Sequence, residues 1–199
     1  MSVEDRYFEG LFAGNNDPWG FRQRWYEQRK RLVTLAALPR PHYRAIFEPG
    51  CANGELSAAL AERCDRLLCC DTSAAAANLA RTRLSLFDHA EVRQGRLPGD
   101  WPEEKFDLIV FSEIGYYLDR QDLTEVIRSI SDSLAADGQL LACHWRPPIE
   151  GCPLNTRQVH DLIHEQLHLP RLVLHQEADF LLEVWSREPR SVAALEGLR

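Results

Sequence analysis

An acidic residue and two spaced glycines, Glu48, Gly50 and Gly54, lie directly after the short apolar run Ile46-Phe47. A helical pattern begins at Glu55, so this stretch is predicted to be a loop between a buried strand and a helix. Such a loop brings backbone N–H groups and the positive end of a helix against a polar ligand. Glycine permits positive φ angles and close approach of a ligand to the backbone. The spacing therefore predicts a ligand-binding loop.

Three ligand chemistries compete for a loop at this position. A phosphate-binding loop needs a Gly-Lys-Ser/Thr sequence, which is absent. A dinucleotide-binding loop needs three glycines where this chain has Gly50, Ala52 and Glu55, and Glu55 would place a carboxylate beside a pyrophosphate. In loops that bind S-adenosylmethionine, an acid precedes the first glycine by two residues. Glu48, Gly50 and Gly54 match that third pattern.

Further candidate ligand-binding residues follow the next apolar runs. Asp71 comes after the run Leu67–Cys70, where a carboxylate can accept two hydrogen bonds from a ribose diol. The segment Gly95–Leu97 could hold an adenine between apolar side chains and backbone amides. Ser112–Leu118 follows the strongest apolar run of the chain. Because ligands of open α/β sheets bind beyond the carboxyl ends of the strands, we expect these segments to line one cleft.

Apolar runs alternate with helical patterns from Ala45 onwards, which predicts a parallel sheet covered on both faces. Two late runs, 171–176 and 180–187, are close enough in sequence to pair antiparallel at the edge of the sheet. The predicted architecture is a doubly wound α/β domain, preceded by a helix over 21–38. The other predicted strands are 46–47, 67–70, 90–93, 106–111 and 139–145, and the other predicted helices are 55–63, 74–86, 123–134 and 158–167.

Composition excludes several classes of protein. The chain has 199 residues, a net charge of −7 and 45% hydrophobic residues, which is ordinary for one folded domain. The acidic balance argues against nucleic-acid binding as its main activity, because phosphate contacts need a basic surface. No apolar run is long enough for a membrane span or a secretory signal, and the cysteines form no Cys-x-x-Cys pair. We therefore expect a cytoplasmic protein with reduced thiols.

The order of these motifs resembles that of class I S-adenosylmethionine-dependent methyltransferases over residues 45–187. Within that superfamily the chain is most similar to the nodulation protein S family, on the segments 17–21, 25–27, 47–51 and 112–118. The resemblance implies a mostly parallel seven-stranded Rossmann-like sheet with an N-terminal helical lid. The implied segments are a lid over residues 1–44, a cofactor-binding domain over 45–188 and a tail over 189–199.

The resemblance also implies an activity, with S-adenosylmethionine as cofactor and S-adenosylhomocysteine as product. The expected acceptor is the free amine of a deacetylated chitooligosaccharide, another amino sugar or a small molecule, and the enzyme is expected to be a monomer or homodimer. Since an ammonium has no lone pair, a nearby base must hold the amine and take its proton. Glu113 and His144 are the candidates for that base, and the choice between them stays open.

The remaining roles come from the same resemblance. Tyr116, Tyr117 and Trp145 are the expected substrate-binding residues. The expected cofactor-binding residues are Trp19, Lys30, Glu48, Gly50, Cys51, Ala52, Gly54, Asp71, Thr72, Gly95, Arg96, Leu97, Ser112 and Glu113.

Two positions depart from the family pattern. The middle glycine of the loop is Ala52, and Arg96 stands where many relatives carry an acid for the adenine amino group. Two other functions remain open: a nicotinamide-dependent oxidoreductase, which Asp71 permits, and a non-catalytic binding module on the same fold. A metal site is not expected, because His160 and His164 lack the intervening glutamate of a metalloprotease motif.

Overall fold

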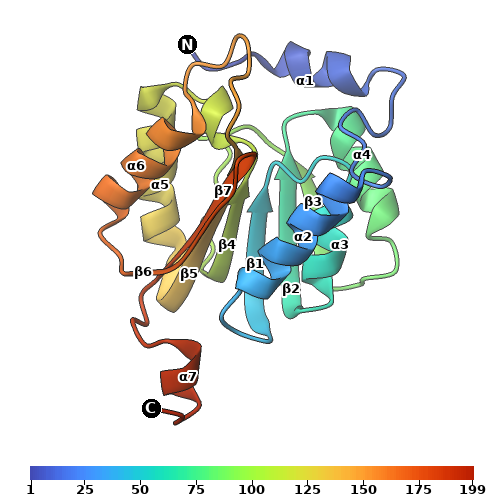
Figure 1. Cartoon of the computed structure of the whole chain (residues 1–199). Coiled ribbons are helices and arrows are strands. Elements are labelled where there is room, and N and C mark those ends of the chain that lie inside the picture. Colours follow the sequence, from blue (N-terminus) through green and yellow to red (C-terminus); the bar gives the residue numbers. More distant parts are fainter.

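Seven strands form one mixed sheet in the computed structural model, which describes all residues 1–199 (Figure 1). The order across the sheet is β3-β2-β1-β4-β5-β7-β6. The first five strands run parallel, and β7 runs antiparallel to both β5 and β6. This confirms the doubly wound, mostly parallel sheet and the antiparallel pairing of the last two strands. The strands are β1 (Tyr43–Pro49), β2 (Cys64–Asp71), β3 (Ala90–Gln94), β4 (Phe106–Ser112), β5 (Leu134–Trp145), β6 (Arg171–Gln176) and β7 (Phe180–Ser186).

Helices cover both faces of this sheet (Figure 1). Apolar residues of α2, α3 and α4 pack on one face, and those of α5 and α6 pack on the other. The helices are α1 (Asp5–Phe12), α2 (Trp25–Ala37), α3 (Glu55–Ala61), α4 (Ala74–Arg83), the 3₁₀ turn η1 (Gly115–Tyr117), α5 (Arg120–Ser133), α6 (Thr156–Leu167) and α7 (Val192–Leu195). No helix is both long enough and apolar enough to cross a bilayer.

The segment before β1 differs in two ways from the prediction. The helix predicted over 21–38 begins at Trp25, because the Asp17 carboxylate accepts the backbone N–H groups of Phe21 at 2.8 Å and Arg22 at 3.1 Å and holds a turn there. A separate helix, α1, was not predicted. It lies across the carboxyl ends of the strands (Figure 1).

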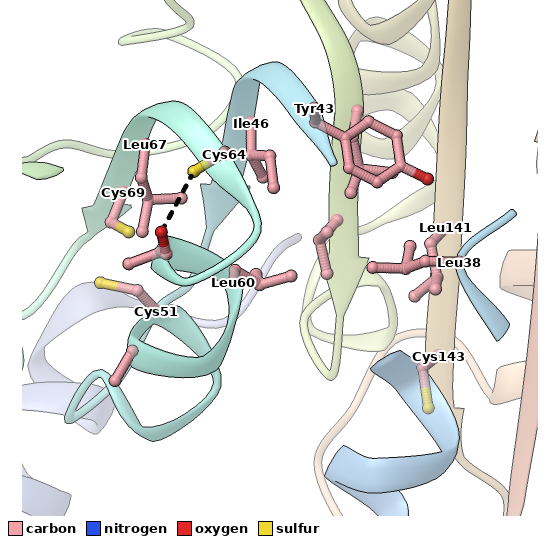
Figure 2. Packing of buried hydrophobic residues seen from close by; sticks show 14 of the residues in the cluster. Leu38, Tyr43, Ile46, Cys51, Leu60, Cys64, Leu67, Cys69, Leu141 and Cys143 are labelled. Atoms are coloured by element: carbon pink, nitrogen blue, oxygen red, sulfur yellow. Dashed lines mark hydrogen bonds between the residues drawn. The ribbon is translucent and has the colours of Figure 1, made fainter. Parts of the chain in front are cut away.

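The core on the α2–α4 face combines aliphatic side chains with thiols (Figure 2). Cys51, Cys64, Cys69 and Cys143 are buried there among residues such as Ile46. All six cysteines of the chain are free. Burial raises the pKa of the Cys64 thiol to about 12, so it is protonated and packs as a small apolar group.

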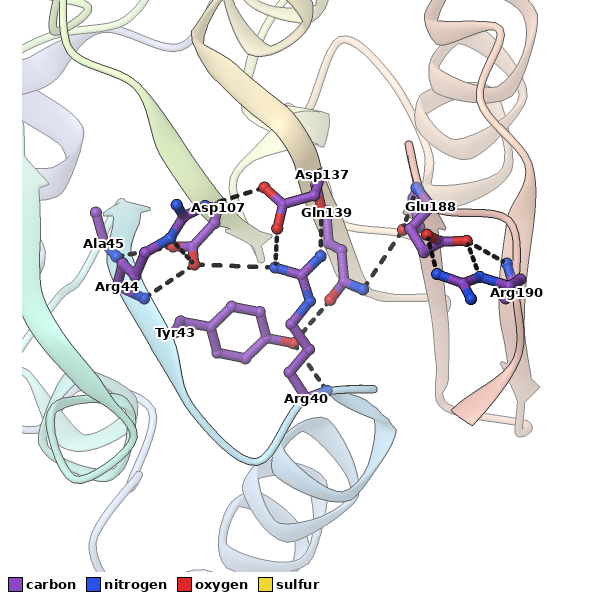
Figure 3. A network of polar contacts seen from close by, with 10 residues as sticks. Arg40, Tyr43, Arg44, Ala45, Asp107, Asp137, Gln139, Glu188 and Arg190 are labelled. Atoms are coloured by element: carbon purple, nitrogen blue, oxygen red, sulfur yellow. Dashed lines mark hydrogen bonds and ion pairs between the residues drawn. The ribbon is translucent and has the colours of Figure 1, made fainter. Parts of the chain in front are cut away.

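A polar network ties the elements together near the amino-terminal ends of β1 and β4 (Figure 3). The buried Asp107 carboxylate accepts the backbone N–H groups of Arg44 at 2.9 Å and Ala45 at 2.7 Å. The Arg40 guanidinium bonds the Asp137 backbone oxygen, linking the start of β1 to β5. These contacts hold β1, β4 and β5 together near their amino-terminal ends.

Candidate active site

A cavity of about 400 Å³ opens at the carboxyl ends of the strands, beneath α1. Its walls come from the N-terminal segment, from α2 and from the loops after β1, β2, β3, β4 and β5. This is the position at which open α/β sheets bind ligands, and the volume suits a small molecule. The predicted residues that line it are Trp19, Lys30, Gly50, Ala52, Asp71, Thr72, Gly95, Arg96, Leu97, Ser112, Glu113, Tyr116, Tyr117 and Trp145.

The loop after β1 has the backbone conformation that its glycines predict. Gly50 and Gly54 have φ angles of 73° and 80°. A Cβ on Gly50 would lie 2.3 Å from the Ile114 Cγ2 atom, so only glycine fits against that side chain. Ala52 also adopts a positive φ, 49°, which costs a non-glycine residue about 1–2 kcal/mol. The chain accepts this strain at the cavity wall.

Asp71 holds this loop against the end of β2. Its Oδ2 atom accepts the Ala52 N–H at 2.9 Å, and its Oδ1 atom accepts the Ser73 N–H at 2.9 Å. Burial raises the pKa of the Asp71 carboxyl to about 6. Each oxygen keeps a further lone pair, so the carboxylate can still accept hydrogen bonds from a ligand in the cavity.

Three predicted loop residues lie behind the cavity wall and do not line it. Glu48 is buried, and burial raises its pKa to about 7, while its Oε2 atom accepts from the Cys69 thiol at 3.5 Å. Cys51 packs in the core, and Gly54 approaches the Ala80 backbone of α4. Their placement supports the loop from behind rather than through contact with a ligand.

The wall formed after β3 carries the basic side chain of Arg96. Arg96 points to the N-terminal segment, with its guanidinium 3.6 Å from the Asp5 carboxylate. Its backbone N–H donates to the Asp100 Oδ2 atom at 2.8 Å. Gly95 and Leu97 line the cavity beside it. The side chain at position 96 therefore ties α1 to the sheet.

Aromatic residues of the N-terminal segment close the opposite side of the cavity, and sequence reasoning missed those of α1. The Phe8 ring packs edge-on against Tyr117, with centroids 4.9 Å apart. Phe12 packs in the same way against Trp19 at 5.7 Å. The apolar residues of α1, Tyr7, Phe8, Leu11 and Phe12, fall at helical spacing, and this was the signal available.

Glu113 accepts more hydrogen bonds than any other carboxylate that lines the cavity. Its Oε1 atom is 2.6 Å from the Lys30 Nζ atom. Its Oε2 atom accepts from the Tyr116 hydroxyl at 2.6 Å and from the Trp145 backbone N–H at 2.8 Å. Lys30 also pairs with Glu27 at 3.1 Å. Burial alone would lower the pKa of Lys30, but Glu113 and Glu27 outweigh it and hold that pKa above its ordinary value.

The backbone of Glu113 is strained as well, with a φ of 60°. Left-handed conformations of non-glycine residues gather at functional sites, where the surrounding structure enforces them. Here the enforced conformation turns the carboxylate toward α2 and the end of β5.

His144 does not reach the cavity. Side chains alternate along a strand, so Trp145 faces α2 and the cavity whereas His144 faces α6. The ring is fully buried, and its Nε2 atom accepts the Gly115 N–H at 3.0 Å. Burial, with His160 and Lys30 nearby, holds the pKa of His144 well below its ordinary value. Of the two candidate bases, the geometry therefore favours Glu113.

Tyr26 is a further cavity residue that sequence reasoning missed. Its hydroxyl is buried without a hydrogen-bond partner. The ring packs edge-on against Trp145, with centroids 5.4 Å apart. No spacing rule marks it, because it lies in the first turn of α2 among charged residues.

Groups of three or more His, Cys, Asp or Glu placed to hold a metal ion are absent.

The chain matches a known family along most of its length. The sequence profile of the family described as Nodulation protein S (NodS) matches residues 11–152. The Nodulation protein S of Bradyrhizobium diazoefficiens is 31% identical over 128 residues, which cover 63% of this chain and 61% of that protein. The chain thus spans about three fifths of the curated relatives it matches.

Two solved structures are similar over a larger share of the chain. A Pseudomonas syringae protein assigned to the methyltransferases is 61% identical, with a TM-score of 0.75, over 82% of this chain and 99% of that chain. The N-methyltransferase NodS of Bradyrhizobium japonicum WM9, bound to S-adenosyl-L-homocysteine, is 26% identical, with a TM-score of 0.82, over 91% of this chain and 96% of that chain.

The cofactor named by these relatives fits the residues of this cleft. The backbone at Gly50 leaves no room for a Cβ, and the Asp71 carboxylate faces the same cavity with acceptor capacity to spare. This chain belongs to the nodulation protein S family, within the class I S-adenosylmethionine-dependent methyltransferase superfamily.

Proposed function

We propose that this chain is an S-adenosylmethionine-dependent N-methyltransferase whose acceptor is the free amine of a deacetylated chitooligosaccharide, another amino sugar or a small molecule. The observation that carries the proposal is one cavity that is lined both by Asp71 with the Gly50 loop and by the Glu113 cluster, which is Glu113 with Lys30 and Tyr116. Asp71 and the Gly50 loop suit a nucleoside, and the Glu113 cluster suits a cation that must lose a proton.

The cofactor end of the cavity divides among three groups of residues. Asp71 accepts hydrogen bonds from the ribose diol, and the loop at Gly50 and Ala52 approaches the ligand through its backbone. Residues 95–97 and Thr72 hold the adenine through backbone and apolar contacts. Lys30, Trp19 and Ser112 hold the methionyl end, which therefore lies beside Glu113, the partner of Lys30. Glu48, Cys51 and Gly54 shape this loop from behind. We propose that residues 1–44 act as the lid over domain 45–188, with 189–199 as a tail.

The acceptor end is built for an amine. When bound, S-adenosylmethionine supplies an activated methyl group on a sulfonium sulfur. Most of the rate enhancement then comes from holding the acceptor nitrogen in line, which is the role of Tyr116, Tyr117 and Trp145. Glu113 takes the proton that leaves the nitrogen. The Lys30 ammonium pairs with Glu113, which supports this as a position that stabilises a cation.

The buried hydroxyl of Tyr26 adds a polar contact for the acceptor. It lacks a partner within the protein, and an unpaired buried hydroxyl is costly. A hydroxyl or amine of the acceptor sugar would satisfy it. Phe8 and Trp145 both line the cavity and offer apolar surfaces for a sugar ring.

The first test is calorimetric titration of the chain with S-adenosylhomocysteine. Micromolar binding by the wild type and its loss in Asp71→Ala are expected, with Asp88→Ala, at an exposed position away from the cavity, binding as the wild type does. Absence of binding in the wild type would contradict the proposal and would direct attention to nicotinamide cofactors.

The second test identifies the acceptor. Transfer of labelled methyl from S-adenosylmethionine is measured with deacetylated chitooligosaccharides, with glucosamine and with their N-acetylated forms. Methylation of the free amines alone is expected, because an acetylated nitrogen has no available lone pair. Cofactor binding without methylation of any amine would instead indicate a binding module.

A further inference from the structure

A chain of four side chains runs behind the cavity from the edge of the sheet to the turn η1. The Arg171 guanidinium on β6 pairs with the Oε1 atom of Glu183 on β7. The Glu183 Oε2 atom lies 2.6 Å from the Nδ1 atom of His160 on α6. The His160 Nε2 atom lies 3.0 Å from the Nδ1 atom of His144 on β5. His144, His160 and Glu183 are all buried, with at most 3% of each residue exposed.

The hydrogen bonds define one proton arrangement along this chain. The Gly115 N–H donates to the His144 Nε2 atom, so Nε2 carries no proton. A neutral His144 then carries its proton on Nδ1 and donates it to the His160 Nε2 atom. His160 in turn carries its proton on Nδ1 and donates it to the Glu183 carboxylate. Both rings are therefore Nδ1–H tautomers, and the anionic Glu183 carboxylate accepts the last of these protons.

Beyond His144 the hydrogen-bonded series ends at the backbone amide of Gly115, and this determines what the series can do. An amide N–H does not exchange its proton during catalysis, so the four residues cannot carry the proton released by methyl transfer. They orient instead. Gly115 is pressed against its surroundings, since a Cβ there would lie 2.5 Å from the Val159 Cγ1 atom and 2.9 Å from the His144 Nε2 atom.

The oriented segment carries a cavity residue. Gly115 begins η1, and Tyr116 in the same turn donates its hydroxyl proton to Glu113. Fixing the Gly115 N–H therefore fixes the direction from which Tyr116 meets the Glu113 carboxylate. A buried network in which every donor and acceptor is satisfied holds such an orientation rigidly.

We propose that Glu183 and His160 are positioning residues for methyl transfer, which act through His144 and Gly115 on the Tyr116–Glu113 pair. The proposal rests on the proposed function, in which Glu113 takes the proton of the acceptor amine. The anionic Glu183 sets the direction of every hydrogen bond in the chain. Its loss lets both histidines change tautomer and frees the turn.

The tautomers are tested directly by nitrogen NMR of protein labelled with ¹⁵N-histidine. Signals of His144 and His160 are assigned by their loss in His144→Phe and His160→Phe. Two Nδ1–H rings are expected in the wild type. An Nε2–H signal from either ring would contradict the proposed arrangement of protons. This measurement needs no stable Glu183 variant.

The kinetic test uses Glu183→Gln, which keeps the size of the side chain and removes its charge. We expect kcat with a deacetylated chitooligosaccharide to fall about tenfold, which corresponds to about 1.4 kcal/mol of lost transition-state stabilisation. KM and the S-adenosylhomocysteine Kd should stay within about twofold, because no cavity contact is lost. Glu188→Gln, which breaks only a surface pair with Arg190, is the matched control.

The outcomes separate this proposal from the proposed function. A wild type that binds S-adenosylhomocysteine and methylates amines, with kcat unchanged in Glu183→Gln, overturns the positioning role alone. If Glu183→Gln does not fold, Arg171→Gln removes the surface end of the array and is measured in its place. A wild type that binds no S-adenosylhomocysteine overturns the proposed function, and the positioning role in transfer with it.

Discussion

The carboxylate of Glu9 caps the first turn of α4: its Oε1 atom accepts the Ala74 backbone N–H at 2.6 Å, and its Oε2 atom accepts from the Ser73 hydroxyl at 3.1 Å. A negative charge at this end of a helix is stabilised by the helix dipole. Glu9 belongs to α1, and Ser73 follows Asp71 and Thr72 of the cavity wall. One side chain thus fastens the N-terminal segment beside the proposed ribose site.

Removing this cap should loosen α1 over the cofactor. We expect Glu9→Ala to speed the dissociation of S-adenosylhomocysteine several-fold, because the cap contributes about 1 kcal/mol and each 1.4 kcal/mol is a factor of ten. Stopped-flow displacement measures this rate. Glu4→Ala removes a carboxylate that pairs only with Arg6 and is the control. Equal dissociation rates in the two variants would contradict the role of Glu9.

Replacing Ala52 by glycine should stabilise the protein. Ala52 holds a φ of 49° at a cost of about 1–2 kcal/mol, while glycine adds about 0.5–1 kcal/mol of unfolded-chain entropy. The net gain is therefore about 0.5–1 kcal/mol, measured by denaturant unfolding. The matched change Ala58→Gly, inside α3, should destabilise by about as much. A loss of stability in Ala52→Gly would show that the methyl group of Ala52 makes contacts worth more than the strain.

The buried Glu48 should make stability fall as pH rises. Burial raises its pKa from 4.5 to about 7. Below the unfolded value both states hold the proton, and between the two values only the folded state does, so stability is lost as pH rises through this window. At about 1.4 kcal/mol per unit, the loss is roughly 3 kcal/mol. Asp71, with a pKa of about 6, adds to it in the same direction.

Thermal unfolding between about pH 5 and pH 8 measures this dependence. Glu48→Gln should flatten the fall in Tm, while Glu62→Gln, at an exposed position on the end of α3, should leave it unchanged. Parallel slopes in the wild type and Glu48→Gln would show that Glu48 ionises at an ordinary pH.

Glu113→Gln should slow methyl transfer without loss of the cofactor. The variant keeps the shape of the side chain but cannot take a proton, so we expect kcat to fall about 100-fold. The Kd of S-adenosylhomocysteine should change by less than about threefold. Glu125→Gln on the surface of α5 controls for the substitution. A kcat within about twofold of the wild type would remove Glu113 from the proton transfer.

Periodicity and loop chemistry were sufficient to predict the sheet from the sequence. β4 is buried on both faces and reads as one apolar run, and the late runs form the expected antiparallel pair of β6 and β7. Gly50 and Asp71 were predicted because close approach of a ligand to the backbone requires glycine, and because a carboxylate can accept hydrogen bonds from a ribose diol. Each requirement concerns one position beside a strand end, so it can be recognised in a single sequence.

The contacts between distant segments were not predictable in the same way. His144 was a candidate base, but which face of β5 meets the cavity depends on how α2 and α6 pack. The pairing of Lys30 with Glu113 joins residues far apart in sequence, and no spacing rule reports it. α1 has only eight residues, and a helix this short depends on tertiary contacts such as those of Glu9 with Ala74 and of Phe8 with Tyr117, which local periodicity does not report.

The strand order also sets a sequence of events for folding. β6 is synthesised before β7, yet β6 pairs only with β7, and β7 alone joins them to β5. β6 can therefore join the sheet only after Phe180–Ser186 is available to pair with it. Glu183 lies on β7, the last strand of the chain, so the support of the turn that carries Tyr116 depends on the last strand to be synthesised. A nascent chain that ends before β7 would contain the loops after β1, β2 and β4 but lack the Glu183 carboxylate that His160 contacts.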